Sequence, residues 1–323
     1  MGFFDRLYYG KAGKADYTER DMPKNRVSLF FLVWKDHFFD LVKANALQLV
    51  FWLPFLIWTY MNLNVIQSID AQAILAAENG SQNLMGTITA YIMTWLIGCI
   101  PCLAITGPSS AGAAYIMRNW ARDQHAFLFS DFKDAFKGNW KQALGVSVIT
   151  AFIPAIGYTA VSFYAQMAAQ NAVMLLPMIL TLSALIIWAL MLPLLYPMMI
   201  GYELGFKALL KNALLMSAAR FPQMMLARLI TFVPIAALLV GVYLGNMIII
   251  LVVSLYYLLF GFAFSRLVYA SFANGVFDQF LNPHIEGAVV GQGLRPQTDE
   301  DELLDDDDDE DEDDETYGED EED

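Results

Sequence analysis

The residues able to do chemistry are few, and their spacing points to no reaction. Cys99 and Cys102 have the separation of a redox pair, but they lie in an apolar run without His, Asp or Glu beside them, where thiols usually pack as small hydrophobic groups. The three histidines are far apart, and none has a second His or Cys one helical turn away, which disfavours a metal site. Phosphate-binding loops, zincin motifs and nucleophile elbows are absent from the sequence. We therefore predict no enzyme activity, no cofactor and no metal.

The composition indicates a membrane protein. The chain is 57% hydrophobic and 16% charged, unlike a soluble protein of 323 residues. Its formal charge of -15 arises at one end, because residues 299–323 hold 20 of the 34 acidic side chains. Such a tail cannot form a core and is expected to be disordered and repelled by an anionic leaflet. The predicted environment is a lipid bilayer, and no nucleic-acid partner is expected.

Charge-free runs define the predicted spans, since a helix needs about 20 residues to cross a bilayer. Four such runs cover residues 44–69, 79–117, 142–202 and 229–265. The first accommodates one span. In the second, Pro101 and Gly107-Pro108 separate one span, from about Met85 to Ile105, from a shorter helix that leads to Tyr115. The third forms a hairpin that turns near residues 166–171, and the fourth forms two short spans that turn at Gly245-Asn246. None of the six predicted spans contains an ionisable residue other than Cys or Tyr, which disfavours transport driven by protons or sodium ions.

The basic residues give the topology. With six spans, all 19 Lys and Arg residues fall on the same side of the membrane, which the positive-inside rule makes the cytoplasmic side. Both termini are then cytoplasmic. The predicted organisation is a cytoplasmic N-terminal segment with an amphipathic helix (1–43), a transmembrane domain (44–280) and a disordered acidic cytoplasmic tail (281–323).

An internal repeat divides the transmembrane domain. The approaches to the first and third spans share five residues at a constant offset of 94, namely Phe38, Asp40, Lys43, Asn45 and Gln48 with Phe132, Asp134, Lys137, Asn139 and Gln142. A fainter copy before the fifth span comprises Phe206, Lys207, Lys211 and Asn212. The predicted fold is therefore an all-α, polytopic membrane protein with about six transmembrane helices in three helix-hairpin units, each led by an amphipathic juxtamembrane helix. Such repeats can enclose a transport site or reflect duplication for packing alone.

The middle unit carries the clearest surface pattern. Phe132, Phe136 and Trp140 recur every four residues beside a row of lysines, and Asp131 suits the first turn of a helix. This pattern is typical of an interfacial helix. The aromatic stripe could anchor the helix in lipid or contact a partner subunit.

Three segments together are similar to a known family. They are Met22-Pro-Lys-Asn-Arg26 before Leu29, Thr106-Gly-Pro-Ser-Ser-Ala-Gly112, and Asp131-Phe132 to Phe136. Together they resemble the YesL-like membrane proteins of Gram-positive bacteria, a family with a domain of unknown function that is often encoded beside sugar ABC transporters. The resemblance implies a bacterial plasma-membrane location and an association with carbohydrate uptake, but no established activity.

Three hypotheses about function follow. The first is an accessory or partner of a carbohydrate transport system, in contact with components of a carbohydrate ABC transporter. The second is a transporter or permease subunit for a neutral solute such as a sugar, and the third is a membrane enzyme. The predicted partner surface of the first hypothesis comprises Gly107, Pro108, Asp131, Phe132, Phe136 and Trp140.

Overall fold

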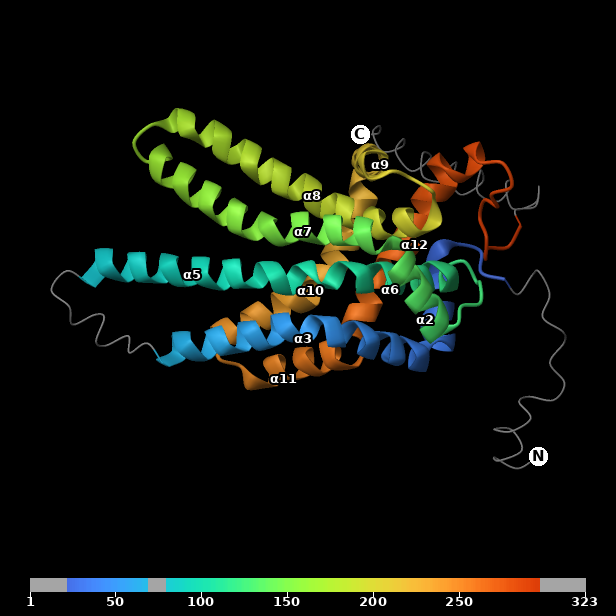
Figure 1. Ribbon diagram of the computed structural model, residues 1–323, viewed down its shortest axis with the longest axis horizontal. Helices are drawn as coiled ribbons and strands as arrows, with labels where there is room; N and C mark the ends of the chain where they lie inside the picture. Colours follow the sequence, from blue (N-terminus) through green and yellow to red (C-terminus); the bar gives the residue numbers. More distant parts are fainter. Residues whose placement is uncertain (1–21, 69–79, 297–323) are drawn as a thin grey trace, which may run out of the picture.

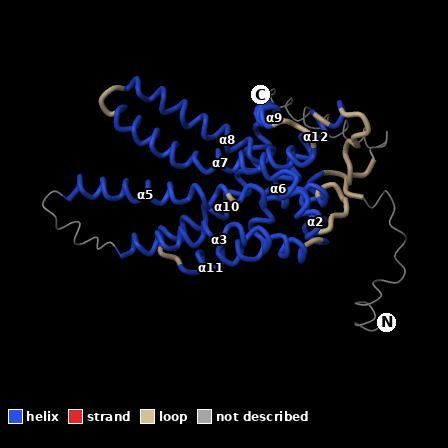
Figure 2. Tube along the Cα trace, in the orientation of Figure 1, coloured by secondary structure: helices blue, strands red, loops and turns tan. Residues whose placement is uncertain are grey.

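A computed structural model of the protein describes residues 22–68 and 80–296. Within these ranges the chain forms helices and loops and no strands (Figure 2). Five of the helical stretches are long and apolar enough to cross a membrane, and a bent pair of helices makes a sixth. The all-α fold with about six spans is thus confirmed.

The helices follow one another along the chain (Figure 1), and the segment between α3 and α5 lies outside the described residues. Their bounds are α2 (Arg26–Asp36), α3 (Phe38–Ser68), α5 (Gly80–Ala104), α6 (Thr106–Trp120), α7 (Leu128–Ala168), α8 (Leu175–Gly201), α9 (Phe206–Ala219), α10 (Phe221–Leu244), α11 (Met247–Tyr256) and α12 (Phe262–Phe280). A π-helical stretch, η3 (Tyr257–Gly261), joins α11 to α12, and short 3-10 turns, η2 (Ala172–Met174) and η4 (Asn282–His284), lie before α8 and after α12.

Both predicted hairpin turns are confirmed. The chain turns between α7 and α8 at residues 169–174, where the Asn171 side chain accepts a hydrogen bond from the backbone of Val173. It turns again at Gly245, whose φ of 63° lies in the left-handed region that favours glycine, and Asn246 caps the next helix. These two turns lie at the opposite end of the bundle from α2 and the α6–α7 connection (Figure 1).

The break between α5 and α6 bends the chain by 49°. Pro108 has no N–H, so the carbonyl of Ala104, four residues earlier, cannot receive its usual helical hydrogen bond. The Ser147 hydroxyl of α7 donates to that carbonyl at 2.6 Å instead. After the break, α6 runs through the middle of one end of the bundle (Figure 1), and 13 of its 15 residues are buried.

The last predicted span is part of a helix that is longer than its charge-free run. Helix α12 continues past Ser265 to Phe280, so Arg266 and Asp278 belong to the same helical stretch, Met247–His284. Neither Gly nor Pro directly follows Ser265 to end the helix. Arg266 is accommodated because its Nη2 donates to Ser110 Oγ at 2.6 Å and its guanidinium lies 4.9 Å from the centre of the Tyr196 ring.

The three repeat units begin differently. Helices α3 and α7 run from the predicted juxtamembrane segment into the apolar stretch without a break. In the third unit α9 is a separate helix, and Pro222 stands in the first turn of α10. The repeat therefore relates the segments that lead into the spans of each unit, and in the third unit the helix is interrupted between α9 and α10.

The packed chain extends beyond the predicted boundary at residue 281. Asn282 is buried, Leu294 packs against a core formed by α2, α3, α6 and α12, and the Arg295 N–H donates to the Pro23 carbonyl at 3.0 Å. This segment returns to the end of α6 and covers it. Residues 1–21 and most of the predicted acidic tail, from 297 on, lie outside the described residues.

Candidate functional site

Two residues of the predicted partner surface lie inside the protein. Gly107 and Pro108 are buried in the first turn of α6. A Cβ atom at Gly107 would overlap the Ala143 carbonyl oxygen and Ser147 Oγ of α7. Glycine therefore lets the α6 and α7 backbones touch, and neither residue is available to a partner in this conformation.

The aromatic stripe also turns largely inward. Phe132 is 8% exposed and packs against α6, where a Cβ at Gly112 would lie 2.8 Å from the Phe132 carbonyl oxygen. Phe136 is half-buried, with its ring centre 5.5 Å from that of Phe51. The predicted interfacial helix is the first part of α7, and Asp131 receives a 2.8 Å hydrogen bond from the Phe127 N–H at its start. The first two rings thus join the bundle core.

Trp140 alone of this stripe is exposed, at 46%. The Lys141 ammonium lies 5.7 Å from the centre of its ring. Both residues line a pocket of about 860 Å³ between α7 and the end of α8. Its walls are Gly138–Gln142 and Met199–Leu204, and the Gln142 amide closes one side by donating to the Leu204 carbonyl at 2.7 Å.

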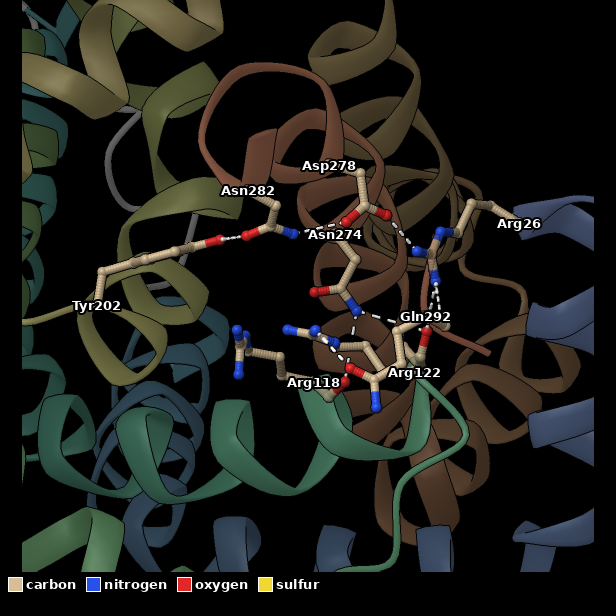
Figure 3. A network of polar contacts seen from close by, with 9 residues as sticks. Arg26, Arg118, Arg122, Tyr202, Asn274, Asp278, Asn282 and Gln292 are labelled. Carbon is tan, nitrogen blue, oxygen red and sulfur yellow. Dashed lines mark hydrogen bonds and ion pairs between the residues drawn. The ribbon is translucent and has the colours of Figure 1, made fainter. Parts of the chain in front are cut away.

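A network of polar side chains lies next to this pocket, at the end of α6 (Figure 3). It joins α2, α6, the end of α8, α12 and the segment after α12, through Arg26, Arg118, Arg122, Tyr202, Asn274, Asp278, Asn282 and Gln292. Tyr202 donates to Asn282 Oδ1 at 2.7 Å, and Asn282 Nδ2 donates to Asp278 Oδ1 at 2.6 Å. The other Asp278 oxygen forms an ion pair with Arg26.

The C-terminal segment is attached to the network through Gln292. Its carbonyl accepts from Arg26 Nη1 at 3.0 Å, and its side-chain Oε1 accepts from Arg122 Nη2 at 2.6 Å. Burial and the neighbouring Arg118 charge lower the pKa of Arg122, while burial raises the pKa of Tyr202. The network is therefore a partly desolvated site in which positive charge predominates.

A family comparison covers the centre of these features. The model of DUF624, a family of proteins of unknown function, matches residues 84–160. No curated protein and no solved structure matches the chain. The protein is thus a polytopic membrane protein with a DUF624 domain. That domain spans most of α5, all of α6 and most of α7, and so contains the buried Gly-Pro segment, the aromatic stripe and two of the three arginines of the network.

Sequence reasoning missed the polar network. Arg26, Arg122 and Asp278 are 96 to 252 residues apart in the chain, and they meet only because α2, α6 and α12 share one end of the bundle. The signal that points to such a cluster is the gathering of all bases on one side of the predicted topology, but this signal does not specify which of them meet. Cys99 and Cys102 are free thiols in α5, the first buried and the second half-buried.

Proposed function

We propose that this chain is a non-enzymatic, multi-pass protein of the bacterial plasma membrane that acts as a partner of a carbohydrate transport system. Its DUF624 domain contains two of the three segments that resemble the YesL-like proteins, Thr106–Gly112 and Asp131–Phe136. Carbohydrate transport is the context that this resemblance implies. The DUF624 description itself carries no activity.

One observation carries the proposal: Trp140 stands exposed at an open pocket at one end of the bundle. A large aromatic side chain beside a concave surface is the usual anchor of a protein interface. Lys141 and Glu203 at the same pocket add charges of both signs, which favours a polar rim around that anchor. The proposed docking surface is therefore Trp140, Lys141 and the end of α8.

The packing of α6 favours a partner over a permease. Ala111, Ile116 and Met117 are each 0% exposed, so α6 fills the middle of the bundle at the end where the pocket opens. A solute path there would require this helix to move. Docking on the outer edge of the same end requires no such rearrangement.

The docking surface is assigned to the cytoplasm, where both termini are also proposed to lie. Single cysteines at Gly138, in the first third of α7, and at Gln170, in the turn after it, test this in a background lacking Cys99 and Cys102; both positions are exposed. In intact cells an impermeant maleimide should label Gln170→Cys. Gly138→Cys should be labelled only after the membrane is permeabilised. The reverse labelling pattern would overturn the orientation.

Trp140→Ala tests the docking surface. We expect it to reduce co-purification of the permease and ATPase subunits of a sugar ABC transporter at least about tenfold, because aromatic anchors contribute most of the binding energy of an interface. Phe129→Ala is the matched control, since Phe129 is 67% exposed on the same helix and does not line the pocket. Quantitative mass spectrometry after mild detergent extraction measures both. Equal recovery from the two variants, or no transporter subunit recovered with the wild type, would contradict the proposal.

A further inference from the structure

The polar network contains more positive than negative charge. It contains three guanidinium groups, from Arg26, Arg118 and Arg122, and one carboxylate, that of Asp278 (Figure 3). Both oxygens of that carboxylate are already occupied, one by Arg26 and the other by the Asn282 amide. Within the described residues, Arg118 and Arg122 therefore lack a carboxylate partner.

The remaining neighbours do not neutralise these two arginines. Arg122 donates to the uncharged Gln292 side chain. The C-terminal end of α6 contributes only about half of a negative charge through its aligned peptide dipoles. Two guanidinium groups in a partly desolvated place therefore retain a net positive charge of more than one unit, which is costly unless an anion compensates it.

Arg118 also has unused hydrogen-bonding capacity. Its Nε is buried without a hydrogen-bond partner, and its guanidinium lies 5.7 Å from the centre of the Tyr202 ring. Tyr202 is held in place by its hydrogen bond to Asn282. The absence of a side chain at Gly201 provides space for the Arg118 guanidinium, because a Cβ there would lie 2.8 Å from Arg118 Nε. The Arg118 guanidinium thus packs against an aromatic ring and a glycine backbone, and it has no acidic partner among the described residues.

We propose that Arg118 and Arg122 form a binding site for a phosphate-bearing anion. Guanidinium groups match the oxygens of a phosphate with paired, charge-assisted hydrogen bonds. Both side chains are partly exposed, so an anion can reach them. Tyr202 and Gly201 act as positioning residues, and Asp278 confines Arg26 to the far side of the site. The site shares Gly201 and Tyr202 with the pocket at Trp140, but anion binding by its two arginines does not require a partner protein.

Two sources can supply this chemistry. The site lies at the end of the bundle that carries the basic residues, which is the level of headgroups in an anionic leaflet, so phosphatidylglycerol is one source. Free phosphate or a phosphorylated small molecule from the aqueous side is the other. Both sources present phosphate oxygens to the same two arginines, so only experiment can distinguish a lipid headgroup from a free anion.

The test uses the full chain purified in neutral detergent. Isothermal titration with inorganic phosphate measures the free anion, and native mass spectrometry after exposure to phosphatidylglycerol or phosphatidylcholine measures lipid retention. We expect Arg118→Gln and Arg122→Gln to weaken anion binding about tenfold or more, as expected for a lost charge-assisted contact. Gly201→Ala should weaken it as well while keeping every charge, because it displaces the Arg118 guanidinium.

Arg220→Gln is the matched control, since Arg220 is also partly exposed and lies 5.8 Å from the centre of the Phe280 ring, outside the network. Its affinity should stay within about twofold of the wild type. Elution volume and thermal unfolding verify that each variant is folded. Phosphate binding that depends on the two arginines supports a free anion, and selective retention of phosphatidylglycerol supports a headgroup. No binding of either by the wild type, or equal binding by all variants, would overturn the proposal.

Discussion

Gly107→Ala is expected to destabilise the protein by about 3 kcal/mol or more, at the upper end of overpacking effects in protein cores. The added Cβ would overlap the Ala143 carbonyl oxygen and Ser147 Oγ, and it would lie 2.8 Å from the Ala143 carbonyl carbon. Backbone atoms cannot move aside as a flexible side chain can. Helix α6 would have to separate from α7, and the Ser147 hydrogen bond to the Ala104 carbonyl would be lost with it.

The control for this prediction is the same substitution at Gly138, also on a helix of the α6–α7 pair. Gly138 is exposed, and nothing lies within 4 Å of the place its Cβ would take. Alanine there should be neutral or should stabilise the protein by about 0.5–1 kcal/mol, because glycine is a poor helix former. Unfolding by sodium dodecyl sulfate in mixed micelles measures both variants. A change of the same sign and size in both would mean that the α6–α7 contact is looser than described.

The break before α6 shows what the sequence could predict. The proline and glycine indicated where the helix bends, and the structure confirms that position. The run of Gly, Ala and Ser residues from Gly107 to Ala114 also carried a signal of burial, since small residues let helices approach closely. The prediction of a partner surface at Gly107 and Pro108 failed because exposure depends on which helices surround the segment, and no local pattern specifies them.

The aromatic stripe had the same ambiguity. A spacing of four residues places Phe132, Phe136 and Trp140 on one side of a helix, whether that side faces lipid, a partner or the core. The direction of α7 relative to α6 turns the first two rings inward and leaves the third exposed. Similarly, the polar network is made by tertiary contacts between helices far apart in sequence, so counting bases could not predict its members.

One side chain from another helix makes four hydrogen bonds around the π-helical stretch η3. Asn45 of α3 is 0% exposed. Its Nδ2 donates to the carbonyls of Tyr257 and Leu258 at 3.0 and 2.9 Å, and its Oδ1 accepts from the N–H groups of Phe262 and Ala263 at 2.9 and 3.2 Å. One amide thus bridges both sides of the widened turn. It joins the first hairpin unit to the last.

Asn45→Leu should therefore reduce the free energy of unfolding by about 2–4 kcal/mol. A single side-chain hydrogen bond inside a membrane protein contributes about 0.6 kcal/mol on average, and Asn45 makes four of them. The backbone groups left unpaired in the variant add to the loss. The repeat supplies the control. Asn139 occupies the equivalent position 94 residues later, is only half-buried, and donates one hydrogen bond, to the Ala135 carbonyl of its own helix at 3.2 Å. Asn139→Leu should cost less than about 1 kcal/mol. Detergent unfolding curves of the two variants measure both losses of unfolding free energy. Losses of equal size would show that η3 does not need the Asn45 amide of α3. A loss confined to Asn45→Leu would show that the contact with α3 maintains the π-helical turn between α11 and α12.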